Sequence, residues 1–157
     1  MKKVLAFFVS LLFLSCLTGC LLVPKDTEPV EQIGEGTLGS YYVKITDHFV
    51  AKTISGKDVF ILSFDFTNNN NSSGVSAASA LGLTLFQSGI ELSQASVLFP
   101  ISGYSSSNYH TKVKDGATLN CQVAFSLRSA DDPVEVEIAP SFSFGTEKVT
   151  AELDIAD

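Results

Sequence analysis

The sequence predicts an all-β fold, an antiparallel β-sandwich of about seven to eight short strands. Two observations support this prediction. Apolar and polar side chains alternate with a period of two in most segments after Gly36, as they do in strands that bury one face. Turn-forming Gly, Asn, Asp and Pro residues separate these segments, and no segment after Gly36 has the periodicity of an amphipathic helix.

The strongest predicted strand follows a turn at residues 55–58. One of its faces carries Phe60, Leu62, Phe64 and Phe66, and the other carries Ser63, Asp65 and Thr67. Large apolar side chains on one face predict a central strand whose inner face builds the core.

The remaining strands follow from the same alternation. They are expected at residues 41–45, 81–85, 90–92, 97–99, 118–127, 134–138 and 148–155. Gln87-Ser88-Gly89 predicts a hairpin turn after the strand at 81–85, because such turns need residues that tolerate positive φ. Pro100 ends the short strand at 97–99, and a serine-rich loop follows it.

The N-terminus has the order of a bacterial lipoprotein signal peptide. Lys2 and Lys3 precede an apolar run at residues 4–17, which ends in Leu17-Thr18-Gly19-Cys20, a sequence that resembles a lipobox. We expect residues 1–19 to be removed and the Cys20 thiol to carry lipid. The acyl chains would then hold the protein on the extracellular face of the bacterial cell membrane.

An uncleaved transmembrane anchor is the alternative. Residues 4–23 carry no charge, and about 20 such residues suffice to span a bilayer. A plain anchor gives no reason for two small residues followed by cysteine, so the lipoprotein interpretation is favoured. Cys16 lacks a small pair before it, which makes Cys20 the better lipid acceptor.

The sequence divides into three parts: a signal peptide at 1–19, a lipid-anchored flexible tether at 20–36 and a sandwich domain at 37–157. The tether contains Pro and Gly residues and has no strand or helix periodicity. The ~120 residues that remain suit a single domain, which we expect to be monomeric.

The charge of the chain limits its partners. It carries 10 basic and 17 acidic residues, a net charge of −7. Removal of Lys2 and Lys3 leaves 8 basic against 17 acidic residues, or −9. Such a surface repels phosphate groups, which argues against nucleic acid and leaves membrane contact to the lipid anchor. An envelope protein or a glycan is the partner that remains.

Cys121 is the cysteine left in the mature domain, so no disulfide can form within it. It shares the apolar parity of the strand at 118–127. We therefore expect a buried small apolar side chain rather than a reactive thiol.

A family resemblance is carried by six segments. They are YVKI at 42–45, VFILSFDFTN at 59–68, FQSGIEL at 86–92, VKDG at 113–116, VAFSL at 123–127 and PVEV at 133–136. This series resembles an uncharacterised domain of Firmicute lipoproteins, related to telokin-like immunoglobulin-like domains. The resemblance implies an immunoglobulin-like sandwich on the cell surface. It implies no catalytic or ligand residues.

The remaining chemistry-bearing residues form no recognisable site. His48 and His110 lack a second ligand at metal-site spacing, and Asp131 and Asp132 lack the alternating acids of a calcium loop. No serine lies in a G-x-S-x-G elbow, and no glycine-rich phosphate loop follows a strand. The sequence predicts a protein that is not an enzyme and has no metal or cofactor.

The loop at residues 103–110 is the candidate binding loop. We expect it to expose Tyr104 and Tyr109, with Asn108 and several serines between them, a composition typical of adaptable recognition loops. This favours a non-catalytic binding or interaction module of the cell envelope. A purely structural or accessory envelope domain with no specific ligand is the alternative.

Overall fold

The computed structural model describes residues 31–71, 74–142 and 146–155. The signal peptide and the expected lipid-bearing Cys20 lie outside these residues. Among the described residues, no helix is long and apolar enough to cross a bilayer.

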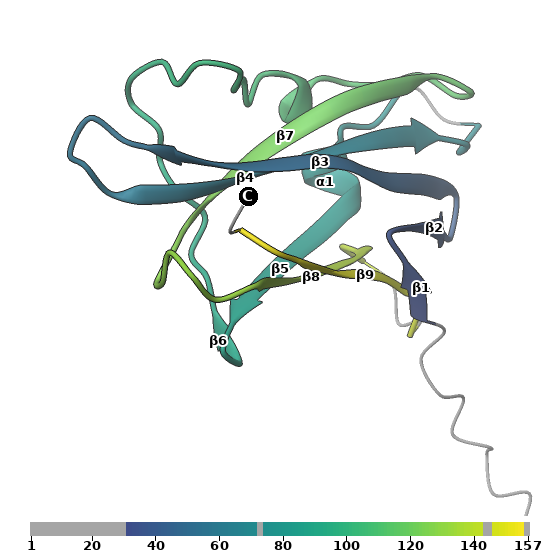
Figure 1. Cartoon of the computed structure of the whole chain (residues 1–157). Coiled ribbons are helices and arrows are strands. Elements are labelled where there is room, and N and C mark those ends of the chain that lie inside the picture. Colours follow the sequence, from purple (N-terminus) through teal and green to yellow (C-terminus); the bar gives the residue numbers. More distant parts are fainter. Residues whose placement is uncertain (1–30, 72–73, 143–145, 156–157) are drawn as a thin grey trace, which may run out of the picture.

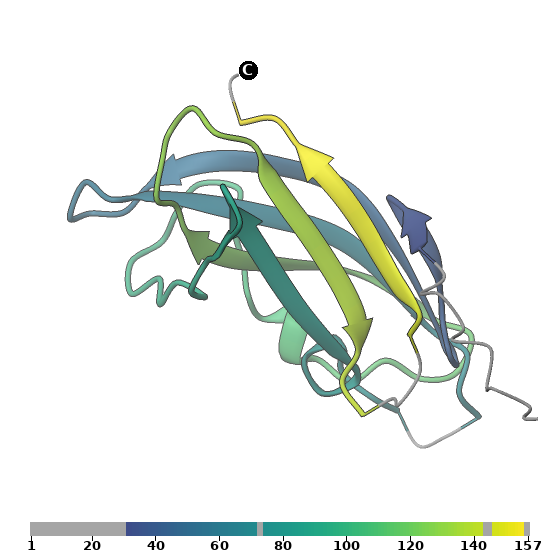
Figure 2. The ribbon, with the colours of Figure 1, turned by 90° about the horizontal axis from the view of Figure 1, so that it is seen from below.

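The described chain forms two stacked β-sheets (Figure 1). The five-stranded sheet has the order β1 (Glu31–Ile33), β9 (Lys148–Leu153), β8 (Val134–Pro140), β5 (Leu81–Gln87) and β6 (Ile90–Glu91). The four-stranded sheet has the order β2 (Glu35–Leu38), β3 (Tyr41–Lys52), β4 (Asp58–Asn68) and β7 (Thr118–Ser126). Neighbouring strands are antiparallel, except that β1 and β9 are parallel. Figure 2 shows β5, β8 and β9 side by side in front of the second sheet. The predicted sandwich is confirmed.

The core lies between the two sheets, where the inner face of β4 supplies its largest side chains. Phe60, Leu62, Phe64 and Phe66 are all fully buried there, as their spacing predicts. They pack against apolar side chains that alternate along β5, β8 and β9. Because β3 and β7 flank β4 on both sides, β4 is a central strand as expected.

A β-bulge in β3 changes which of its side chains face the core. The register shifts between Ile45 and Asp47, so that Val43 and Ile45 face inward, whereas Phe49 and Ala51 face outward. One inserted residue reverses the parity of every residue that follows it. The alternation in the sequence predicts β3 only up to the bulge.

The outward face of the four-stranded sheet is also partly covered. Val59, Ile61 and Ala124 are buried on this face, beneath the segment that joins β6 to β7. That segment forms no strand at residues 97–99, so the prediction of a strand there is wrong. Its apolar side chains instead cover the sheet, and the segment forms two isolated bridges, one between Gln94 and Phe125 and one between Val113 and Val75.

The folded domain begins earlier than the sequence suggests. Residues 31–33 form β1 and residues 35–36 begin β2, although the sequence assigns them to a tether. Their sequence shows no strand pattern, because backbone hydrogen bonds rather than buried side chains hold them in place. The Gly34 N–H donates to the Thr150 carbonyl at 2.8 Å, and the Ile45 N–H donates to the Gly34 carbonyl at 2.8 Å.

Two buried amides hold the loops at the strand ends. Asn68 is fully buried and donates from Nδ2 to the Val113 carbonyl at 2.8 Å. Gln87 is 1% exposed; its Nε2 donates to the Asp132 carbonyl at 2.8 Å and its Oε1 accepts from the Arg128 N–H at 2.9 Å. Buried polar groups are stable only when bonded in this way, so both residues have a structural role.

Candidate functional site

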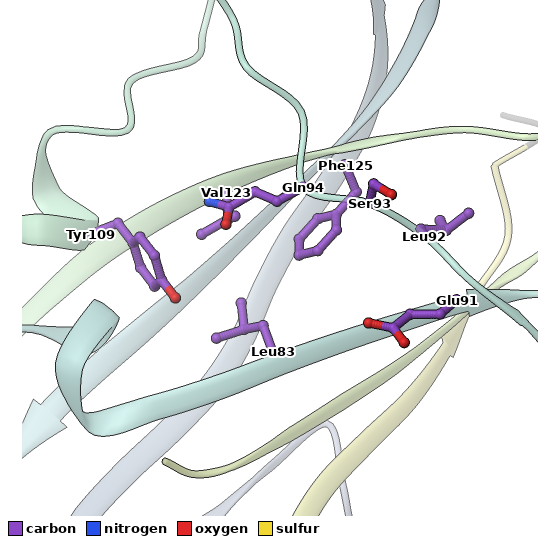
Figure 3. Close-up of a pocket in the computed structure, with 8 residues that line it drawn as sticks. All are labelled: Leu83, Glu91, Leu92, Ser93, Gln94, Tyr109, Val123 and Phe125. Carbon is purple, nitrogen blue, oxygen red and sulfur yellow. The ribbon is translucent and has the colours of Figure 1, made fainter.

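An open cleft of about 440 Å³ lies where the two sheets part, between the edge of β5 and β6 and the edge of β7 (Figure 3). It is lined by Leu83, Glu91, Leu92, Ser93, Gln94, Tyr109, Val123 and Phe125. We call it the edge cleft. A cleft of this size can hold a small ligand or a short peptide segment, and most of the surface that it exposes is polar.

The walls of the edge cleft are an extension of the core. Leu83 comes from β5, Val123 and Phe125 come from β7, and all three side chains belong to the main apolar cluster. They are held on paired strands, so their positions are fixed by the sheets. These three side chains are therefore rigid, although most of the surface that the cleft exposes is polar.

Tyr109 brings a polar group into this apolar space. It lies on the short 3₁₀ helix η1 (Asn108–His110), is 8% exposed, and packs its ring edge-on against Phe64. Its hydroxyl points into the cleft (Figure 3), and no described residue hydrogen-bonds to it. Burial, with a smaller contribution from nearby Cys121, raises the pKa of Tyr109, so the hydroxyl is neutral at physiological pH and can both donate and accept.

Glu91 and Gln94 supply the rest of the polar rim. Figure 3 shows the Glu91 carboxylate turned toward the same space as the Tyr109 hydroxyl. Glu91 is exposed, and none of the three ion pairs among the described residues includes it. The rim is therefore negatively charged and has no basic side chain among its lining residues.

The structure separates the three residues of the candidate binding loop. Tyr109 lies between the sheets, whereas Tyr104 is half-buried against the outer cluster of the four-stranded sheet. Asn108 donates from Nδ2 to the Asn120 carbonyl at 2.9 Å, which ties the loop to β7. The expectation that one loop exposes both tyrosines is wrong for Tyr109, because η1 turns its ring into the core.

Sequence reasoning missed Glu91 and Gln94. The hairpin turn before them was predicted, but its second strand has only two residues, and the chain then crosses to the other sheet. The signal that was available is the polar run Ser93-Gln94, which interrupts the alternation directly after Leu92.

The other sequence candidates have structural surroundings. The Nε2 atom of His48 lies 2.7 Å from the Asp154 carbonyl oxygen, and the described residues contain no cluster of three or more metal-binding side chains. Cys121 is fully buried, and burial, helped by the charge of Asp65, raises the pKa of its thiol to about 11. The prediction of a buried Cys121 is confirmed.

A second hollow of about 330 Å³ lies at the β3–β4 hairpin. Ile54 is 77% exposed and Leu98 is 86% exposed beside it. Exposed apolar patches often mark interaction surfaces, but this hollow has no buried polar group to orient a ligand. The edge cleft is therefore the better candidate site.

The fold and the cleft together define a class of protein: a β-sandwich domain with a ligand-sized opening where its two sheets part. The chain belongs to the DUF5067 family, a domain of unknown function, whose model matches residues 23–140. No curated protein matches the chain.

Two solved structures are similar to it. One is a "putative lipoprotein" of Staphylococcus aureus, with a TM-score of 0.55 and 12% identity, covering 74% of this chain and 90% of that one. The other is an uncharacterised β-sandwich protein of Clostridium difficile, with a TM-score of 0.55 and 13% identity, covering 82% of this chain and 98% of that one. At these identities the likeness shows the fold alone.

Proposed function

We propose that this protein is a non-catalytic binding module of the cell envelope, anchored to the outer face of the membrane by lipid on Cys20, with the edge cleft as its ligand site. One observation carries the proposal: the Tyr109 hydroxyl points into the cleft from a nearly buried side chain and has no hydrogen-bond partner among the described residues. The hydroxyl is reached by solvent, because no side-chain nitrogen or oxygen among the described residues is both buried and without a partner, so a polar group of a ligand can replace the water there.

The chemistry of the lining supports binding over catalysis. The residues that line the edge cleft include neither histidine, lysine nor cysteine. A tyrosine with a raised pKa is a poor general base near neutral pH, and a carboxylate alone at the rim has no nucleophile to activate. The lining is suited to hold a ligand through a few hydrogen bonds and apolar contacts.

A pull-down from detergent-solubilised envelope fractions tests the proposal. The bait is the unlipidated chain, residues 20–157 with Cys20→Ser, and its two variants are Tyr109→Phe and the matched control Tyr104→Phe. We expect a saturable protein or glycan partner that Tyr109→Phe weakens about tenfold, as loss of one good hydrogen bond does. Tyr104→Phe should leave binding unchanged, because Tyr104 packs on the opposite face of the sheet.

Two results would overturn the proposal. A chain that captures no saturable partner would support the alternative, a structural or accessory envelope domain. Turnover of a substrate by the purified chain would overturn its non-catalytic character.

A further inference from the structure

The edge of β5 that borders the cleft is largely unpaired. β6 pairs with β5 only at Phe86 and Gln87, and one more hydrogen bond joins the Leu92 N–H to the Leu85 carbonyl at 2.7 Å. The chain then crosses to the other sheet, where the Ala95 N–H donates to Ala124 at 2.8 Å. Residues 81–84 of β5 therefore have β8 on one side and no described strand on the other.

The backbone of Leu83 faces this open side. The Leu85 carbonyl points toward β6, and in a strand the carbonyls of residues two apart point the same way. The N–H and C=O of Leu83 thus point toward the space beyond the end of β6. No described residue bonds to them, and Leu83 lines the cleft.

This edge also lacks the usual protection. Natural edge strands are blunted by charged residues, proline or bulges, because an unpaired edge accepts another strand. Residues 81–84 read Leu-Gly-Leu-Thr, with neither a charge nor a proline. The four residues are thus suited to pair with an incoming extended chain.

The negative charge at the rim of the cleft favours an incoming peptide that carries a basic side chain. Glu91 has no ion-pair partner among the described residues, and the mature chain is strongly acidic. A basic side chain would compensate the Glu91 carboxylate, and Leu83, Val123 and Phe125 would contact the apolar side chains that alternate with it in an extended peptide.

We infer that the edge cleft binds an extended peptide segment that adds as a short strand to the free edge of β5 and places a basic side chain against Glu91. This inference rests on the proposed function and names the ligand class of the same site. The peptide backbone would bond to Leu83, and the Tyr109 hydroxyl and the Gln94 amide would bond to polar groups of the peptide.

The test uses three probes and the unlipidated chain. The first probe is a blocked pentapeptide of alternating Val and Lys, the second is the same peptide with Glu in place of Lys, and the third is n-hexylamine, a small cation with an apolar tail. Backbone amide NMR shifts report binding, and hydrogen exchange at Leu83 reports strand pairing.

We expect the lysine peptide to bind and to slow hydrogen exchange of the Leu83 amide at least about tenfold, and the glutamate peptide to have no effect. Glu91→Gln should weaken the lysine peptide about tenfold, whereas Glu152→Gln, an exposed acid on β9, should not. N-methylation of the peptide bonds that face β5 should abolish binding, because the side chains remain but the backbone donors are lost.

Other outcomes overturn the inference without touching the proposed function. Binding of n-hexylamine as tight as that of the lysine peptide, with no protection at Leu83, would make the cleft a small-molecule site. Absence of any shift at Leu83 with all three probes would also overturn the peptide assignment, and the envelope pull-down would still decide whether the module binds a partner.

Discussion

The ring of Tyr109 meets the ring of Phe64 edge to face, with centroids 6.3 Å apart and planes at 80°. Phe64 lies at the centre of β4, and Tyr109 lies on η1 in the segment between β6 and β7. Such aromatic pairs add stability beyond the area that they bury. The ring of Tyr109 therefore holds the segment to the core, while its hydroxyl is left for the cleft.

The two roles of Tyr109 can be separated by substitution. Tyr109→Phe keeps the ring and should change the free energy of unfolding by less than about 0.5 kcal/mol, because the hydroxyl has no partner within the described residues. Tyr109→Ala removes the ring and should cost about 2–4 kcal/mol. Urea unfolding of both variants checks this. A loss above about 1 kcal/mol in Tyr109→Phe would mean that the hydroxyl has a structural partner.

Phe64 and Asp65 test the register of β4. Phe64→Ala should cost about 3–5 kcal/mol, because the side chain is fully buried between the sheets. Asp65 faces outward and accepts from Asn120 Nδ2 at 2.9 Å, so Asp65→Ala should cost about 1 kcal/mol or less. Denaturant unfolding compares the two variants, and a larger cost for Asp65→Ala would contradict the register.

The sequence predicts those strands whose alternation is uninterrupted. β4 carries four large side chains on one face, so its position and its buried face follow directly from the period of two. The hairpin after β5 is also predictable, since Ser88 and Gly89 adopt φ of 51° and 73°, as a two-residue turn requires. Both features depend on residues that are close together in the sequence, so a short window is enough to predict them.

The features that the sequence hides depend on tertiary contacts. The bulge after Ile45 reverses the parity of β3 with no local signal, and β1 is held by backbone pairing to a strand more than a hundred residues away. The burial of Tyr109 depends on where the crossing segment places η1. The edge cleft exists because that segment leaves one sheet for the other, which no short window of sequence records.

Cys121 should be unreactive in the folded chain. It is the one thiol of the unlipidated chain, it is fully buried, and its pKa is raised to about 11. A thiol reagent at pH 8 should modify it at least about a hundredfold faster in denaturing urea than in the native state. Rapid modification of the native chain would mean that β7 opens readily at this point.

The same thiol should make stability depend on pH in alkaline solution. The ordinary pKa is 9.0, so as the pH rises toward 11 the thiol ionises in the unfolded chain before it ionises in the folded chain. Its contribution to the free energy of unfolding is complete below pH 9 and is lost as the pH passes the folded value. The free energy of unfolding of Cys121→Ala should decrease less than that of the native chain between pH 9 and pH 11. The same decrease in both chains would contradict the raised pKa of Cys121.

The N-terminal boundary of the domain can be tested by truncation. A chain of residues 31–157 should be more stable than one of 37–157 by about 1–3 kcal/mol, because the shorter chain loses the hydrogen bonds of Gly34 and the Glu35–Lys44 ion pair. The shorter chain also lacks β1, so that β9 becomes an unpaired edge strand, which favours aggregation. Urea unfolding and light scattering compare the two. Equal stability of the two chains would mean that residues 31–36 do not stabilise the domain and belong to the tether.

Lipid attachment at Cys20 is the last prediction. The order of basic residues, apolar run and small pair before Cys20 predicts thioether-linked lipid, and each buried CH₂ contributes about 0.8 kcal/mol to membrane binding. Cells that express the full chain in the presence of labelled palmitate should incorporate the label into the membrane fraction of this protein. Cys20→Ala should lose the label and accumulate the uncleaved form, while Cys16→Ala should behave as the native chain. Label retained in Cys20→Ala but lost in Cys16→Ala would move the anchor to Cys16. Absence of label from the native chain, with the protein still in the membrane fraction, would point to the uncleaved transmembrane anchor.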